Sequence, residues 1–207
     1  MDYLVTLGRM LGFSFAAGIN LYATVAILGL AARFGWVVLP PQFQIFNNRY
    51  IIGAALLMYV IEFVADKIPW VDTIWDMAHT VIRPIGGALI AVATLGEGSP
   101  TVEGFVALLG GTVAAGTHLT KAGSRAIVNT SPEPFSNWFL SLAEDIFVVG
   151  LGFLALKYPL IALAVALVLL ALMAVFARIL WRGIRRLFAG RRPPARASAL
   201  PRAGNGA

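Results

Sequence analysis

The chain has 207 residues, of which 59% are hydrophobic and only 13% are charged. Soluble domains are about 45–50% apolar and about 25% charged, so the composition excludes an ordinary soluble domain. The absence of cysteine excludes disulfides, thiolate metal sites and a cysteine nucleophile. Half of the 16 Lys and Arg residues lie between Arg178 and Arg202, after the most apolar run. Basic residues there are typical of lipid-contacting topology determinants, and no aromatic platform accompanies them, so we expect no nucleic-acid partner.

The pattern predicts an all-α, polytopic membrane protein with about six transmembrane helices. A bilayer core about 30 Å thick needs roughly 20 apolar residues per helix. In chain order, the expected helices cover residues 7–32, 50–67, an amphipathic stretch from 69 that continues across Pro84 to 95, 102–128, 137–156 and 159–181. Paired prolines and asparagines separate the first two, and residues 96–100 break the middle of the chain. Ser136 or Asn137 is expected to cap the fifth helix.

The domain organisation follows from these elements. We expect a membrane domain at residues 1–189, with halves at about 1–96 and 101–181, and a disordered basic cytoplasmic tail at 190–207. The basic end of the last helix indicates a cytoplasmic side, and six crossings then place the N-terminus there as well. The expectation is a multi-pass protein of a cell inner membrane. Its partners would be the bilayer and a small-molecule, ion or lipid substrate, and a homodimer is compatible with so small a chain.

A repeat relates two segments 98 positions apart. Residues 11–21 and 109–119 share Leu-Gly and then Ala-Ala-Gly-x-x-Leu, with Asn20 opposite His118. Three helices per half would force the halves into opposite orientation, so we expect a 3+3 inverted repeat. Inverted repeats with interrupted helices recur in secondary transporters, which bind substrate where the halves meet. The alternative is that Ala-Ala-Gly is a small-residue packing face of membrane helices.

Polar residues inside the expected spans are the candidate site, because charge at that depth needs compensation. Glu62 and Asp66 share a helix face, and so do Lys121 and Arg125. The candidate substrate or proton site comprises Asn20, Glu62, Asp66, His118, Lys121, Arg125, Glu144 and Asp145. Alternatively, the acids mark solvated helix ends and the two bases reach the interface as snorkelling side chains.

A second polar stripe follows residue 69. Asp72, Asp76, His79 and Arg83 recur at spacings of four, three and four, which places them on one helical face. Two carboxylates and an imidazole are weak candidates for a divalent cation site, and a solvated face is the alternative. We expect no cofactor.

Four segments resemble a known family of bacterial membrane proteins. They read AAGINLYAT at 16–24, DKIPWVD at 66–72, HLTKAGSR at 118–125, and NTSPEP at 129–134 followed by Glu144 and Asp145. Together they resemble an uncharacterised integral membrane family known only as a domain of unknown function, over roughly residues 10–156. The resemblance implies a membrane protein and no particular activity.

A weaker likeness is to the undecaprenyl-diphosphate phosphatase family. Glu62-x-x-x-Asp66 and Gly123-Ser124-Arg125 are similar to the Glu-rich motif and the Gly-x-Ser-Arg-Ser segment of that family, although here the segment ends at Ser-Arg-Ala. That likeness implies a membrane-embedded phosphatase. Three functions are therefore open: a transporter or lipid-translocating protein coupled to protons through Glu62 or Glu144, the phosphatase, and a structural or assembly protein.

Overall fold

A computed structural model describes residues 3–129 and 135–189, and all regular elements within them are helical. They are α1 (Tyr3–Ile19), α2 (Leu21–Arg33), the 3-10 helix η1 (Pro41–Asn47), α3 (Arg49–Ala65), α4 (Pro69–Leu95), α5 (Pro100–Val128), α6 (Phe135–Lys157) and α7 (Pro159–Ala189). Four of these, α4 to α7, are long and apolar enough to cross a membrane, fewer than the six expected. The all-α membrane class is confirmed, whereas the tail expected at 190–207 lies outside the described residues.

Prolines and capping residues set the helix ends. Pro69, Pro100 and Pro159 each stand at the first position of a helix, where a backbone N–H would have no partner within the helix. Asn48 caps α3 by accepting a hydrogen bond of 2.8 Å from the Tyr50 backbone N–H. Gly96 ends α4 with a φ of 88°, a conformation that favours glycine. The break predicted at residues 96–100 is therefore confirmed.

The helix expected at residues 7–32 is two helices, because the chain breaks at Asn20. This residue is extended, with φ −142° and ψ 100°, and its side-chain oxygen accepts a 2.9 Å hydrogen bond from the Ala23 backbone N–H. An asparagine at this position caps the new helix, since its side chain replaces a missing backbone acceptor. Periodicity alone did not show the break, because both helices are equally apolar.

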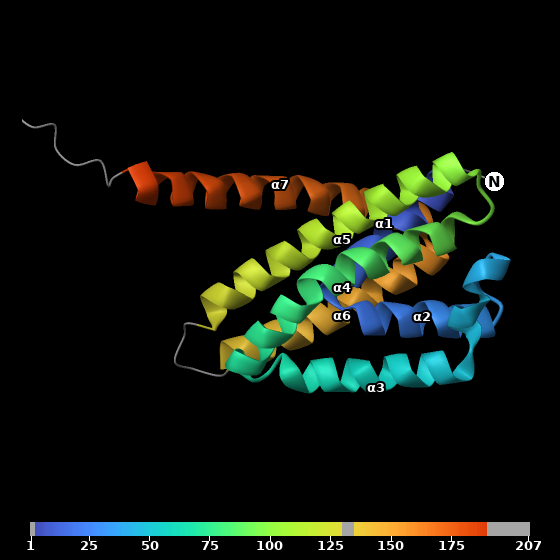
Figure 1. Ribbon diagram of the computed structural model, residues 1–207, viewed down its shortest axis with the longest axis horizontal. Helices are drawn as coiled ribbons and strands as arrows, with labels where there is room; N and C mark the ends of the chain where they lie inside the picture. Colours follow the sequence, from blue (N-terminus) through green and yellow to red (C-terminus); the bar gives the residue numbers. More distant parts are fainter. Residues whose placement is uncertain (1–2, 130–134, 190–207) are drawn as a thin grey trace, which may run out of the picture.

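Both outer ends of the α1–α2 pair lie beside the turn between α6 and α7. A methyl group added at Gly8 would collide with the Pro159 carbonyl oxygen, so α1 begins against the start of α7. Just beyond α2, the Trp36 ring centre lies 4.8 Å from the Lys157 ammonium. The pair therefore starts and ends at one end of the bundle, as a helical hairpin (Figure 1).

The start of α1 and the end of α7 lie at opposite ends of the bundle. From its contact with α1, α7 continues for 31 residues, or about 46 Å at the helical rise. Figure 1 shows α7 running away from the labelled N-terminus. This arrangement differs from the sequence expectation that both termini lie on the same side, which depended on an even number of crossings.

The two repeated motifs pack against each other and run in the same direction. A methyl group added at Gly18 would lie 2.5 Å from the Ala114 carbonyl oxygen and 2.7 Å from Thr117 Cβ. One added at Gly110 would lie 2.9 Å from Ser14 Oγ. Ser14 faces Gly110, and Gly18, four residues later in α1, faces Ala114, four residues later in α5. The two helices therefore run in the same direction here, whereas an inverted repeat requires opposite directions. Small residues allow this close approach.

The molecule is apolar outside and charged inside. Side chains such as Leu57, Phe139 and Leu167 are exposed on the outer faces of α3, α6 and α7. By contrast, Arg83 and Arg125 are the largest of the fully buried side chains. Exposed apolar faces suit a lipid solvent, and buried charges in such a protein are functional candidates by default.

Candidate functional site

A network of charged side chains lies between α3, α4, α5 and α6. Its carboxyl groups belong to Glu62, Asp66, Asp72, Asp76, Glu144 and Asp145, and its cations to Arg83, Lys121 and Arg125. The side chain of Glu144 is the most exposed of those in ion pairs, at 13%. Local geometry assembles the network: Glu62 and Asp66 lie one turn apart at the end of α3, and His118, Lys121 and Arg125 share one face of α5.

Arg83 joins α4 to α3 and α5. One terminal nitrogen lies 2.7 Å from Glu62 Oε1, and the other lies 3.2 Å from Asp76 Oδ1 and 2.6 Å from His118 Nδ1. Since a guanidinium only donates, His118 Nδ1 must accept, and its proton lies on Nε2, which is 3.2 Å from Thr80 Oγ1. Thr80 in turn donates to the Asp76 carbonyl oxygen at 3.0 Å. His118 is therefore a neutral link in the network.

Lys121 connects the network to the break in the α1–α2 pair. Its ammonium lies 2.9 Å from Asp66 Oδ2 and 3.2 Å from the Ile19 carbonyl oxygen, the last of α1. Glu62 Oε1 and Glu144 Oε2 are each 3.6 Å away. A cation at a helix C-terminus is stabilised by the carbonyl groups exposed there. Lys121 is buried, so it is not an interfacial snorkelling residue.

Arg125 of α5 forms hydrogen bonds and ion pairs to both the end of α3 and α6. Its terminal nitrogens lie 3.1 Å from Asp66 Oδ2, 2.9 Å from the Asp66 carbonyl oxygen, 2.6 Å from Asn137 Oδ1 and 2.7 Å from Glu144 Oε2. The side chain is 1% exposed. Arg125 therefore holds three helices together with both terminal nitrogens engaged, and it too is not a snorkelling residue.

Two groups outside the helices have shifted pKa values. Burial raises the pKa of Asp66, but the Lys121 ammonium and the Arg125 guanidinium outweigh it and hold the pKa below its ordinary value. Partial burial lowers the pKa of Lys67, although Asp145 and Asp66 act against it. Asp66 is therefore an ionised anchor for two cations.

Asp145 differs from the four carboxyls that form ion pairs. Asn20 Nδ2 donates to its Oδ1 at 3.3 Å, and its Oδ2 has no hydrogen-bond partner among the described residues. No ion pair joins it to a lysine or arginine in the described part of the chain. It is 6% exposed. Asp145 is thus a buried carboxyl at the helix break with one neutral donor.

The four polar residues of the stripe on α4, Asp72, Asp76, His79 and Arg83, contact different partners. Asp72 accepts from Asn129 Nδ2 at 2.8 Å, and Asp76 pairs with Arg83. His79 Nδ1 lies 2.7 Å from the Trp75 carbonyl oxygen, so it donates there, and Nε2 lies 3.0 Å from the Tyr22 hydroxyl oxygen. Within residues 3–129 and 135–189, no group of three His, Cys, Asp or Glu side chains is placed to hold a metal ion.

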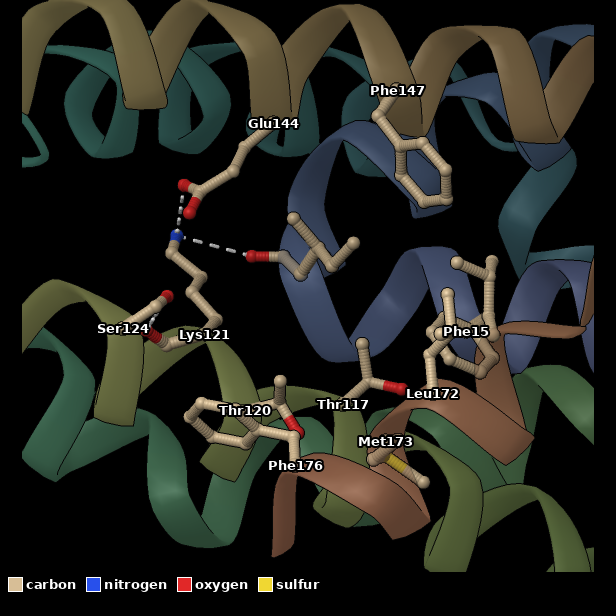
Figure 2. A pocket seen from close by; sticks show the side chains of 12 residues that line it. Phe15, Thr117, Thr120, Lys121, Ser124, Glu144, Phe147, Leu172, Met173 and Phe176 are labelled. Carbon is tan, nitrogen blue, oxygen red and sulfur yellow. Dashed lines mark hydrogen bonds and ion pairs between the residues drawn. The ribbon is translucent and has the colours of Figure 1, made fainter. Parts of the chain in front are cut away.

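A cavity of about 360 Å³ adjoins the network between α1, α5, α6 and α7. Figure 2 shows Lys121 and Glu144 pointing toward each other at one end, while Phe15, Phe147 and Phe176 line the apolar remainder. The cavity therefore brings an apolar space up to Glu144, whose carboxylate is the most exposed of those in the ion pairs of the described residues.

The network holds more acid than base. Six carboxyl groups face four cations, namely the buried Arg83, Lys121 and Arg125 and the half-buried Lys67, and His118 is neutral by its hydrogen bonds, so full ionisation of the carboxyl groups would leave an excess of negative charge. An uncompensated buried carboxylate is costly, so protons or cations must balance this excess. The arrangement is therefore able to bind and release positive charge.

The sequence identified most of the network but not its connections. The eight candidate residues all lie in or beside it. Five contributors were missed in this role: Asp72, Asp76 and Arg83 were assigned to the polar stripe after residue 69, Asn137 to a helix cap, and Asn129 only to a family motif. Spacing along one helix does not show these functions, because the side chains of Arg83, Asn129 and Asn137 contact helices other than their own.

Comparison with curated proteins and with solved structures found no match to this chain. A family model does match, over a longer stretch than the motifs alone suggested. It covers residues 7–179, and the chain belongs to the family described as a domain of unknown function (DUF4126).

Proposed function

We propose that this protein is a small membrane transporter or lipid-translocating protein, coupled to protons through its buried charge network. The observation that carries the proposal is the excess of carboxyl groups over cations in a network buried at the break of a helix pair. Interrupted helices beside buried charge are a recurring way to build a transport site. A carboxyl that exchanges a proton can change the charge of such a site.

A structural or assembly protein is the second candidate, and a specific observation favours it. Asn20, Glu62, His118 and Glu144 are each held in contacts with neighbouring side chains, as a structural network requires. However, a structural network is stabilising only when its charges balance and its hydrogen bonds are complete. The unpartnered Oδ2 of Asp145 and the acid excess do not fit that role.

The phosphatase alternative gains no support from the geometry. Ser124 donates its hydroxyl to the Lys121 carbonyl oxygen at 2.8 Å. Arg125 uses both terminal nitrogens on protein acceptors. A residue that binds a diphosphate needs free donors, so this enzyme reading would require the network to open first.

The membrane arrangement follows from the same features. We propose that α3 to α7 cross the bilayer while α1 and α2 enter and leave from one side, in place of six crossings. The basic residues at the end of α7 would be cytoplasmic, and the start of α1 would then face the opposite side. The transport proposal does not require the inverted repeat, because the break at Asn20 and the charge network supply the site directly.

The decisive experiment uses the lack of cysteine. Single cysteines at Thr24, Thr120, Asn20, Glu62 and Glu144 would be treated with membrane-impermeant thiol reagents from each side. The threonine positions are the primary ones, because their replacement breaks no ion pair. A cysteine at lipid-facing Leu167, 54% exposed, is the control that must stay unlabelled. Labelling at Thr24 or Thr120 supports a water-filled path, whereas protection of all five positions refutes the transporter.

A further inference from the structure

We infer that Asp145 is the proton-binding carboxyl of this protein and that Asn20 couples its protonation to the helix break. The inference rests on the proposed function and specifies its coupling ion. The sequence favoured Glu62 or Glu144 for this role. In the structure, Glu62 Oε1 lies 2.7 Å from Arg83, and Glu144 Oε2 lies 2.7 Å from Arg125. The charge of each of these two carboxylates is therefore already compensated by an arginine.

Two carboxyls of the network, Asp72 and Asp145, have no ion pair within the described part of the chain, and their positions on their helices differ. Asp72 lies in the first turn of α4, where free backbone N–H groups stabilise a negative charge. It also accepts a 2.8 Å hydrogen bond from Asn129. Asp145 is the eleventh residue of α6, far from either helix end, and has only the longer bond to Asn20. Fewer groups therefore stabilise the charged form of Asp145 than that of Asp72, so Asp145 is the better candidate to bind a proton.

The groups that face Asp145 from neighbouring elements supply no positive charge in contact with it that could take the place of a bound proton. Tyr59 and Glu62 approach from α3, Asp66 and Lys67 from the turn after it, and Lys121 from α5. Lys121 is engaged with Asp66, Glu144 and the end of α1. Lys67 donates to the Phe63 carbonyl oxygen at 2.9 Å and to Ser141 at 3.4 Å instead. The two acids add repulsion, which also favours a neutral Asp145.

Asn20 can transmit a change in the protonation of Asp145 to the helix break, because its side-chain amide forms hydrogen bonds to two partners. Its Oδ1 accepts the capping bond from the Ala23 backbone N–H, which leaves Nδ2 to face Asp145. When Asp145 releases its proton to water, both carboxylate oxygens require donors, and Oδ2 has none. The Asn20 amide, which is already the donor to this carboxyl, then moves toward Oδ2. This movement disturbs the cap of α2, so proton release shifts the break in the re-entrant pair.

Two isosteric substitutions test the inference against a structural role. Asp145→Asn reproduces the neutral acid and keeps an oxygen for the Asn20 donor, so we expect a folded protein with an unfolding midpoint close to wild type. Asp66→Asn removes the carboxylate that pairs with two cations, so we expect a clearly lower unfolding midpoint. Infrared difference spectra between acidic and alkaline buffer should contain a protonated-carboxyl band that disappears in Asp145→Asn. Glu97→Gln, at an exposed position, is the control that should keep it.

The outcomes separate this inference from the transporter proposal. If Asp145→Asn unfolds as easily as Asp66→Asn, or if the carboxyl band remains in Asp145→Asn, the inference is wrong. Protection of all the cysteine positions together with loss of the band would instead refute transport and leave Asp145 as the proton-binding group. A cysteine at Thr24 adds a direct readout of coupling. Its labelling should depend on pH with Asp145 present and become independent of pH in Asp145→Asn.

Discussion

Asn20 and Asp145 are 125 positions apart in the chain, and a 3.3 Å hydrogen bond joins them at the break between α1 and α2. The same asparagine caps α2 through Ala23. One side chain therefore maintains a helix start and contacts the least compensated carboxyl of the network. This double use makes Asn20 the point at which the charge of the site and the path of the backbone meet.

Replacing Asn20 with alanine should destabilise the protein by more than an ordinary cap does. Loss of a side-chain cap costs about 1 kcal/mol, and here Asp145 also loses the one hydrogen-bond donor that it has among the described residues. Unfolding in detergent, followed by circular dichroism, measures the change. Ser99→Ala, which removes the longer 3.4 Å cap at the start of α5, is the matched control and should cost less. Equal costs for the two variants would show that the Asp145 contact adds nothing.

Replacing Arg83 with methionine should cost roughly 3–5 kcal/mol, because it leaves buried carboxylates without their cation. Glu62 and Asp76 would both lose a partner. Adding Glu62→Gln to this variant should recover part of the loss, and a double-mutant cycle measures the coupling. Arg49→Met, at an exposed position, should change stability by less than about 0.5 kcal/mol. Additive effects of the Arg83 and Glu62 changes would contradict the pairing.

Replacing Gly110 with alanine should separate α4 from α5. The added methyl would collide with Ala91 and lie 3.0 Å from the Gly87 carbonyl oxygen, and overpacking of this kind costs about 1–3 kcal/mol. Gly104→Ala, on the same helix, is the matched control because nothing lies within 4 Å of its added methyl. That control should stabilise α5 by up to about 1 kcal/mol. Thermal unfolding of both variants should therefore shift in opposite directions, and a shift in the same direction would exclude this packing.

Asp66 should contribute acid-sensitive stability. Its folded-state pKa lies below the ordinary value of 3.8, so its contribution is complete above that value and is lost as pH falls through the folded pKa. The stability difference between wild type and Asp66→Asn should consequently shrink on acidification below about pH 4. Unfolding midpoints recorded across that range measure it. A difference that grows in acid would mean that the pKa is raised instead.

The sequence was a good guide to which residues lie together in the site. It was a poorer guide to the path of the chain that brings them together. The spacing of Glu62 and Asp66, and of Lys121 and Arg125, specified shared helix faces, because four residues make about one helical turn. Arg83 was placed on its correct face, but a face pattern does not say whether water or another helix lies opposite. The break at Asn20 carries no proline, and its angle depends on contacts with α5 and α6 that lie far away in sequence. The direction of α2, and hence the number of crossings, could not be predicted from periodicity.

The re-entrant pair makes a prediction about the sides of the membrane. Cysteines at Tyr3 and Phe34, which are 91% and 65% exposed, should be labelled from the same side, because Tyr3 begins α1, Phe34 follows α2, and both of these helix ends lie beside the turn between α6 and α7. A cysteine at Trp181, 62% exposed near the end of α7, should be labelled from the other side. Impermeant reagents applied to inverted and right-side-out vesicles measure this directly. Six crossings would instead place Tyr3 on the side of Trp181 and Phe34 opposite, so labelling at Tyr3 decides between the two arrangements.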